Sequence, residues 1–276
     1  MEGMFPVRWS LGKTAGYRST RFTTTPSTLI IGPPRCVKTS LLVQAAVTEA
    51  VGDGQVLYIA PKKLLHLPVS VHGMAPPTPR TMQGIKFLYA QETKELISYL
   101  ASLHMIPAGD RPSLIVIDDL HVYSLSSNCG DTATQMMNVA RILSLAQESA
   151  EFCSSTTDTS VGRQCCLLAA WTQDNSSYIK PKELQELATS FCHHVWSVHP
   201  KCKTASSEKR EYTLVEEENG NLCTISFSSR HDSLPTEHLL LHQVSLQSLM
   251  ETSRTEDCSV TICNTKQEDD CDRKSS

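Results

Sequence analysis

Short apolar runs alternate with amphipathic stretches along the middle of the chain. Each run is apolar at successive positions, which is typical of strands that are covered on both faces of a sheet. The stretches between them repeat apolar residues at three- and four-residue spacing, which indicates one buried helix face. The predicted strands cover residues 28–31, 56–60, 85–89, 114–117, 165–171 and 194–198, and the predicted helices cover residues 38–51, 91–104, 132–152 and 181–191.

This alternation predicts parallel strands that are joined by crossover helices, which is the plan of an α/β fold. Nearer the C-terminal end, residues 210–216 and 222–228 flank an Asn219-Gly220 pair. An Asn-Gly pair between two strand-like segments is a strong signal for a β-hairpin. We therefore expect a mostly parallel sheet that is flanked by helices and carries a C-terminal antiparallel hairpin.

The two ends of the chain differ from this middle part. Residues 1–27 and residues 246–276 are rich in polar residues and show no hydrophobic period. Segments that cannot bury enough apolar surface tend to stay unfolded. We expect a flexible N-terminal arm over 1–27, one α/β domain over 28–245, and a disordered tail over 246–276.

Composition limits the function classes. The 276 residues are 40% hydrophobic and carry a net charge of -4, so the chain is neither wholly disordered nor a generally basic nucleic-acid-coating protein. No apolar run approaches the 18 residues of a membrane span, so no membrane partner is expected.

The eleven cysteines do not form a recognisable pattern. Their number is odd, Cys165 and Cys166 are adjacent, and no CxxC pair occurs, which favours free thiols in a reducing compartment. The cluster of Cys192, His193 and His194 with Cys202 has the alternation of a packed strand, so no zinc site is predicted.

A phosphate-binding loop follows the first predicted strand. The loop and the start of the next helix read Gly32-Pro33-Pro34-Arg35-Cys36-Val37-Lys38-Thr39-Ser40. This segment fits the pattern G-x-x-x-x-G-K-[ST] except at its second glycine, which is Val37. In such loops backbone N–H groups cradle phosphates, the lysine reaches the terminal phosphates, and the hydroxyl binds Mg²⁺. We expect Lys38 and Thr39 to take these roles in a site for ATP and Mg²⁺.

Val37 weakens this expectation. The replaced glycine lets the backbone come close to the phosphates, and a β-branched residue at positive φ is strained by roughly 1–3 kcal/mol. The sequence therefore predicts ATP binding that is weak or vestigial.

Two further strands end in polar residues that suit the same site. The run at 114–117 ends in Asp118, and an acid there holds Mg²⁺ in P-loop proteins. The run at 167–172 ends in Gln173, whose amide is a candidate sensor of the γ-phosphate. The neighbouring Asp119 is a candidate catalytic acid–base group, with a turn residue as the alternative.

These elements, in this order, resemble the ATPase core of RecA-type recombinases and their paralogues. Within this family, the motifs are most similar to the small ATPase-like subunit that accompanies a SWIM-domain zinc protein in the animal Shu complex. The resemblance covers residues 28–200 and rests on the segments 85–89, 95–104, 112–120 and 169–173.

The resemblance implies a function in homologous recombination repair, in the nucleus. The expected activity is to promote or protect recombinase filaments on single-stranded DNA. The implied partners are a SWIM-domain zinc protein, RecA-type recombinases and their paralogues, and single-stranded DNA.

The departures from the family pattern bear on catalysis. The family places a glutamate just after its second strand to polarise the attacking water, and the matching residue here is Lys62. With Val37 as well, we expect an ATPase at most. An active P-loop ATPase or small-molecule kinase is one alternative, and a scaffold that works without nucleotide is another.

The family holds DNA with two loops. The first corresponds to residues 121–131, which contain no Lys or Arg. The second corresponds to residues 174–183, where Tyr178, Lys180 and Lys182 combine an aromatic ring with cations as single-strand sites do. A solvated polar loop is the alternative interpretation of the second segment.

Overall fold

The computed structural model describes residues 27–68, 70–71, 73–125, 131–155, 164–174, 179–201, 210–218, 221–230, 238–248 and 259–261. The strands are β1 Ser27–Gly32, β2 Val56–Ala60, β3 Ser70–Val71, β4 Ile85–Tyr89, β5 Leu114–Ile117, β6 Cys166–Thr172, β7 His194–Pro200, β8 Arg210–Glu218, β9 Asn221–Arg230, β10 His238–Ser248 and β11 Ser259–Thr261. The α-helices are α1 Lys38–Val51, α2 Pro79–Gln83, α3 Thr93–Ser102, α4 Leu120–Ser124, α5 Thr132–Ser155 and α6 Pro181–Thr189. Two 3₁₀ turns cover Leu103–Met105 and Ala108–Asp110.

The strands form one sheet that is parallel on one side and antiparallel on the other. Their order is β11-β10-β9-β8-β7-β1-β6-β5-β2-β4, and β3 pairs with β10. From β7 to β4 the neighbouring strands run parallel, and from β7 to β11 they run antiparallel. The predicted α/β class and the predicted hairpin, here β8 and β9, are both confirmed.

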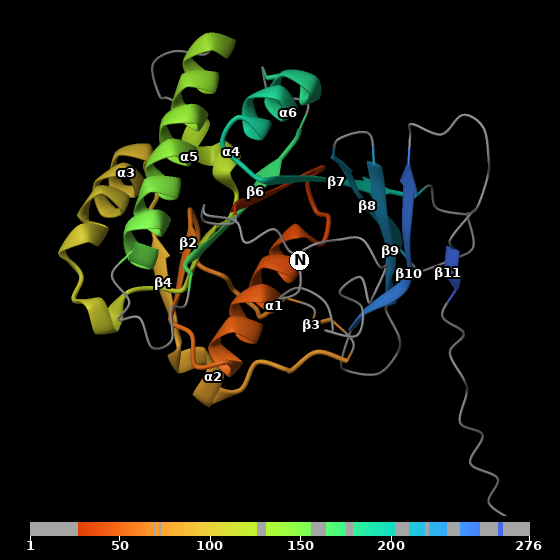
Figure 1. Ribbon diagram of the computed structural model, residues 1–276, viewed down its shortest axis with the longest axis horizontal. Coiled ribbons are helices and arrows are strands. Elements are labelled where there is room, and N and C mark those ends of the chain that lie inside the picture. The colour runs from red at the N-terminus through yellow and green to blue at the C-terminus, as the bar shows by residue number, and fades with distance from the viewer. Residues whose placement is uncertain are drawn as a thin grey trace, which may run out of the picture.

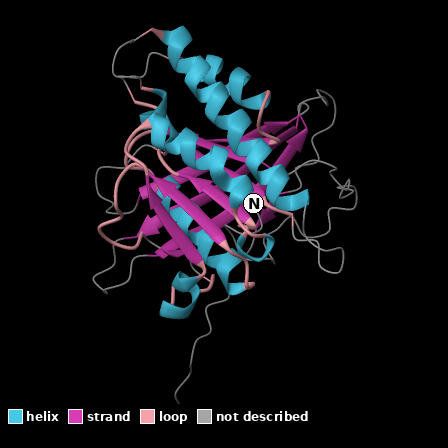
Figure 2. Cartoon of the chain, turned by 90° about the vertical axis from the view of Figure 1, so that its left-hand side faces the viewer, coloured by secondary structure: helices cyan, strands magenta, loops and turns pink. Residues whose placement is uncertain are grey.

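Helices cover both faces of the parallel part of the sheet (Figures 1 and 2). Alternate residues of a strand point to opposite faces, so Leu29 and Ile31 pack with α3, α4, α5 and α6, whereas Ile30 packs with α1. Both faces of the inner strands are therefore buried, which explains why these strands read as continuous apolar runs. The described residues contain no helix that is long and apolar enough to cross a membrane.

The structure adds elements that the sequence pattern did not predict. Helix α4 begins at Leu120 and overlaps the segment 121–131 that was expected to be a loop, because Leu120 and Tyr123 are both fully buried three residues apart. Strand β10 continues to Ser248 and β11 lies within the predicted tail, where β10 pairs with β9 on one side and β11 on the other. At the other boundary Ser27, assigned to the arm, begins β1 and is fully buried.

Candidate phosphate site at the carboxyl ends of the parallel strands

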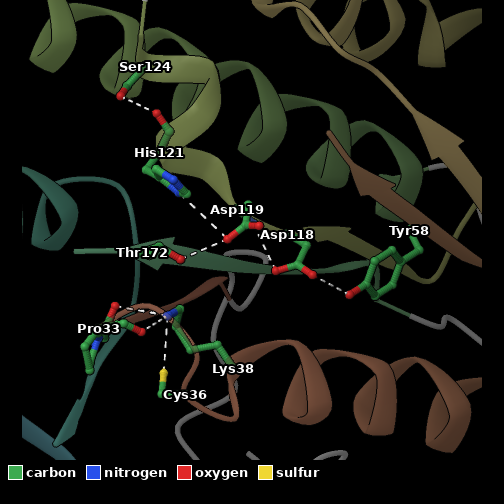
Figure 3. Close-up of polar contacts among 10 residues, drawn as sticks. Pro33, Cys36, Lys38, Tyr58, Asp118, Asp119, His121, Ser124 and Thr172 are labelled. Carbon is green, nitrogen blue, oxygen red and sulfur yellow. Dashed lines mark hydrogen bonds and ion pairs between the residues drawn. The ribbon is translucent and has the colours of Figure 1, made fainter. Parts of the chain in front are cut away.

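The phosphate loop lies between β1 and α1, as predicted. Lys38 is the first residue of α1, and its side chain is buried although it carries a charge. Its Nζ donates to the carbonyl oxygens of Gly32 at 3.0 Å and Pro33 at 2.6 Å, and lies 3.2 Å from Sγ of Cys36 (Figure 3). These contacts compensate for the cost of burying an ammonium group. The side chain of Lys38 therefore folds back on its own loop. Carbonyl oxygens of the loop accept the hydrogen bonds that phosphate oxygens would accept from Lys38 in a nucleotide complex.

The predicted strain at Val37 is wrong. Val37 has φ -75° and ψ 12°, outside the left-handed region in which a β-branched residue is strained, and its half-buried side chain packs against the core beside α1. The left-handed residue of this loop is Arg35, with φ 56° and an exposed side chain. The loop places its unusual backbone angle two residues earlier than the motif suggests, so Val37 gives no conformational reason for weak binding.

The order of the strands brings three polar strand ends together. Strand β6 lies between β1 and β5, in register with both, so its end lies between the phosphate loop and Asp118. The backbone N–H of Gln173 donates to the carbonyl oxygen of Gly32 at 2.9 Å. Because parallel strands end at the same edge of a sheet, the residues after β1, β5 and β6 form one site.

Asp118 is buried at the centre of this site. Tyr58 of β2, itself fully buried, donates from its hydroxyl to Oδ2 of Asp118 at 2.9 Å, and the backbone N–H of Asp119 donates to Oδ1 at 2.9 Å. Burial and the charge of Asp119 raise the pKa of Asp118 to about 6, while hydrogen bonds from Tyr58 and Thr39 oppose that rise. Thr39 and Asp118, the two residues predicted to bind Mg²⁺, are therefore in contact.

Asp119 occupies a different position from Asp118. Its backbone is left-handed, with φ 50° and ψ 46°, and this turn begins α4 immediately after β5. Its Oδ1 accepts a 2.9 Å hydrogen bond from the hydroxyl of Thr172 at the end of β6 and lies 3.8 Å from Nδ1 of His121. Figure 3 shows the row that results, with Thr172 and His121 on Asp119 and Tyr58 on Asp118.

Gln173 is tied to the site through both its backbone and its side chain. Its Nε2 donates to the carbonyl oxygen of Ile179 at 3.1 Å. Its Oε1 is buried without a hydrogen-bond partner among the described residues. The amide N–H₂ group, which would contact a phosphate oxygen, is thus directed to the chain segment beyond residues 175–178, and the side chain offers an acceptor instead.

Three residues of this site were missed by sequence reasoning: Tyr58, Thr172 and His121. Tyr58 lies in the middle of an apolar strand, so nothing local distinguishes it from a core residue. Thr172 directly precedes Gln173 and His121 follows Asp119 by two residues. Their closeness in sequence to predicted site residues was the signal that could have found them.

The other predicted residues are more dispersed. Lys62 follows β2, next to the strand that carries Asp118, and is exposed. Lys180 and Lys182 lie at the start of α6 with side chains 79% and 88% exposed, each facing a glutamate at 3.8–3.9 Å. Tyr178 and Cys202 lie outside the described residues.

The predicted packing cluster around Cys192, His193 and His194 consists of separate contacts. The N–H of Ser27 donates to Nδ1 of His193 at 3.2 Å, and His194 lies 2.7 Å from Oε1 of Glu216, joining β7 to β8. Within the described part of the chain, no three His, Cys, Asp or Glu side chains are placed to hold a metal ion.

Together the sheet order and the loop define a class of protein. A phosphate-binding loop after β1, an acid after β5, a polar residue after the intervening β6, and an antiparallel extension beyond β7 are the arrangement of a RecA-like P-loop fold. The fold that was predicted by resemblance is therefore confirmed.

Similarity in sequence points to particular relatives. The chain is 40% identical over 103 residues to the ATPase SWSAP1 of Mus musculus, and 38% identical over 100 residues to the ATPase SWSAP1 of Homo sapiens. Each match covers 36% of this chain, and the matches cover 34% and 42% of the two relatives. The similarity to a RecA-type paralogue that the motifs indicated is thus confirmed. No protein-family model matches the chain.

Two solved structures match the chain at low sequence identity. A DnaB-like replicative helicase is 12% identical with a TM-score of 0.46, over 75% of this chain and 57% of the helicase chain. The flagellar accessory protein FlaH from Methanocaldococcus jannaschii is 10% identical with a TM-score of 0.47, over 78% of this chain and 89% of FlaH.

Proposed function

We propose that this chain is a RecA-type paralogue that acts in homologous recombination and binds ATP with Mg²⁺ at the carboxyl ends of its parallel strands. The observation that carries the proposal is the convergence of Lys38, Thr39 and Asp118 after β1 and β5. A hydroxyl in contact with a carboxylate is the oxygen donor set that suits Mg²⁺. Mg²⁺ there would screen the phosphate charge, with Thr39 and Asp118 as its holders.

Binding in this site is expected to be weak. Phosphate oxygens must displace the carbonyl oxygens of Gly32 and Pro33 from Lys38. Asp118 must also be ionised to hold the cation, and its raised pKa favours the neutral acid below about pH 6. Both effects reduce nucleotide affinity. A bound divalent cation offsets part of the second effect, because it stabilises the ionised carboxylate.

Hydrolysis is expected to be slow for a different reason. The residue after β2 that would polarise water is Lys62, and an ammonium group cannot accept a proton from water. The Asp119 carboxylate already accepts from Thr172. We therefore propose a weak or vestigial ATPase rather than a rapid one.

The biological part of the proposal rests on the similarity to the ATPase SWSAP1 proteins. We propose that the chain is a nuclear subunit of a Shu-type complex with a SWIM-domain zinc protein. In that complex it promotes or protects recombinase filaments on single-stranded DNA. Lys180, Lys182 and Tyr178 are the proposed DNA contacts.

One experiment separates this proposal from its alternatives. The full chain is coexpressed with a SWIM-domain zinc protein, either as wild type or as Lys38→Ala, with Lys94→Ala on α3 as a control for loss of a surface charge. The copurified material is then titrated with a fluorescent ATP analogue and Mg²⁺.

We expect the SWIM-domain protein to copurify with the wild type, and nucleotide affinity to fall at least tenfold in Lys38→Ala but not in Lys94→Ala. Failure to copurify would contradict the complex. Equal nucleotide affinity in all three chains, with intact copurification, would instead support a scaffold that works without nucleotide.

A further inference from the structure

His121 is held at the phosphate site by two neighbouring elements. It lies in α4, one turn after the paired acids that end β5, and its side chain is 20% exposed. Nδ1 lies 3.8 Å from Oδ1 of Asp119 and is buried without a hydrogen-bond partner among the described residues. The ring also meets Trp171 of β6 edge-on, with 6.1 Å between ring centroids.

The charges around this ring come from three different elements. Asp119 belongs to the turn after β5, Asp174 follows β6, and Lys38 begins α1. Burial lowers the pKa of His121 and is the largest influence; the carboxylates of Asp119 and Asp174 raise it, Lys38 lowers it by a smaller amount, and the net direction is downward. A histidine with a lowered pKa is neutral at physiological pH and has one nitrogen free to accept a proton. Lys38, the residue that is proposed to hold the phosphates, is thus one of the charges that act on the ring.

We propose that His121, oriented by Asp119, is the proton acceptor for the water that attacks the terminal phosphate of the nucleotide. The inference rests on the proposed function, because it assigns a residue to slow hydrolysis at the same site. Nδ1 lies 3.8 Å from Oδ1 of Asp119, and with the proton on Nδ1 the lone pair of Nε2 is the base. This is the division of roles that an acid–imidazole pair uses in general base catalysis.

The proton and the electrons balance in one displacement. The water proton passes to Nε2 of His121, and the water oxygen forms a bond to the γ-phosphorus. The bond between the γ-phosphorus and the bridging oxygen breaks, and ADP leaves with that electron pair. The imidazolium, stabilised by Asp119 and Asp174, then returns its proton to phosphate or solvent.

The neighbouring groups are less suitable for this step. Tyr58 donates its hydroxyl hydrogen to Asp118, and Asp119 accepts from Thr172. Thr172 in turn fixes the Asp119 carboxylate on the side that faces His121 (Figure 3). The hydrogen bond to Thr172 therefore supports the orienting role of Asp119 and leaves the imidazole as the basic group.

The test uses two substitutions in the full chain. Asparagine at position 121 keeps an N–H donor near the position of Nδ1 but has no counterpart of Nε2. His121→Asn is compared with His104→Asn, which changes an exposed histidine in the 3₁₀ turn after α3. Release of inorganic phosphate from ATP, affinity for a fluorescent ATP analogue, and the midpoint of urea unfolding are measured for each chain.

We expect His121→Asn to lower turnover about 100-fold, within the usual range for loss of a general base, with nucleotide affinity within twofold of the wild type. The wild-type rate should also fall at acidic pH as the imidazole of His121 protonates. Asp118 is present in both the wild type and His121→Asn, so a difference between their pH profiles reports on His121. His104→Asn should match the wild type in all three measurements.

Four results would overturn the proposal. The first is turnover in His121→Asn equal to the wild type, and the second is equal pH profiles of the two chains. The third is wild-type turnover no higher than that of Lys38→Ala. In that case the affinity of the wild type for nucleotide would still test the proposed function separately. The fourth is a fall in the unfolding midpoint of His121→Asn together with loss of nucleotide binding, which would assign His121 a purely structural role.

Discussion

The hydroxyl of Tyr58 donates a 2.9 Å hydrogen bond to Oδ2 of Asp118 from the neighbouring strand β2. Both side chains are almost completely buried, so the bond joins the apolar core to the edge of the sheet that carries the phosphate loop. Asp118 thereby receives hydrogen bonds on both oxygens before any ligand binds. Core packing and site chemistry depend on the same pair of residues.

Removal of this hydroxyl should destabilise the fold. We expect Tyr58→Phe to lower the free energy of unfolding by about 1–3 kcal/mol, because a buried carboxylate loses one donor. The matched control is Tyr99→Phe, since the Tyr99 hydroxyl is buried without a hydrogen-bond partner among the described residues. Urea unfolding measures both, and a cost in Tyr58→Phe no larger than that in Tyr99→Phe would contradict a stabilising role of the bond.

Stability should also depend on the ionisation of Asp118. Its pKa in the folded chain is about 6, against 3.8 in an unfolded chain, so the folded state binds the proton more tightly. The corresponding stabilisation is complete below about pH 4 and is lost as the pH rises through 6.

The substitution Asp118→Asn removes this dependence. We expect the free energy of unfolding of the variant, relative to the wild type, to rise by about 2 kcal/mol between pH 4 and pH 7. Urea unfolding in metal-free buffer measures this difference, with Asp110→Asn at an exposed position as the control. A difference that does not change with pH would contradict the raised pKa.

Restoring the motif glycine should not improve the phosphate loop. Because Val37 has φ -75° and packs against the core, we expect Val37→Gly to lower the free energy of unfolding by about 1 kcal/mol and to leave nucleotide affinity no better. Arg35→Gly, at φ 56°, should cost less because glycine adopts that angle freely. Urea unfolding and nucleotide titration test the pair, and tighter nucleotide binding by Val37→Gly would show that its side chain obstructs the site.

The proposed DNA contacts lead to a prediction about salt. Exposed ion pairs such as those of Lys180 and Lys182 contribute little to stability, so both cations remain available to phosphates. We expect the double substitution Lys180→Ala and Lys182→Ala to weaken binding of a single-stranded oligonucleotide and to flatten its salt dependence by about 1.4 in log–log slope.

The matched control for this prediction is the pair Lys86→Ala and Lys94→Ala, on β4, which is the edge strand of the parallel part of the sheet, and on α3. Fluorescence anisotropy at several salt concentrations gives the slopes. Equal slopes for the wild type and the Lys180/Lys182 variant would exclude these lysines as DNA contacts.

Much of the fold was accessible from local pattern. The predicted helix 38–51 is α1, and the apolar runs at 56–60, 85–89 and 114–117 are β2, β4 and β5. Such strands can be recognised in the sequence because both faces of a covered parallel strand must be apolar, which gives a continuous apolar run. Strand β10 and helix α4 were missed because their boundaries depend on partners that are distant in sequence, β9 for one and the core around Tyr123 for the other.

The sequence by itself determined the succession of strands and helices, the position of the phosphate loop, and the acid and amide that follow β5 and β6. Only the tertiary structure decided which strand lies between β1 and β5, and therefore that Thr172 meets Asp119 and that Gln173 meets Gly32. It also decided the backbone angle of Val37 and the approach of Tyr58 and His121 to the paired acids. Periodicity reports which faces are buried, whereas the neighbours at a strand end depend on long-range pairing, because side chains far apart in sequence meet there.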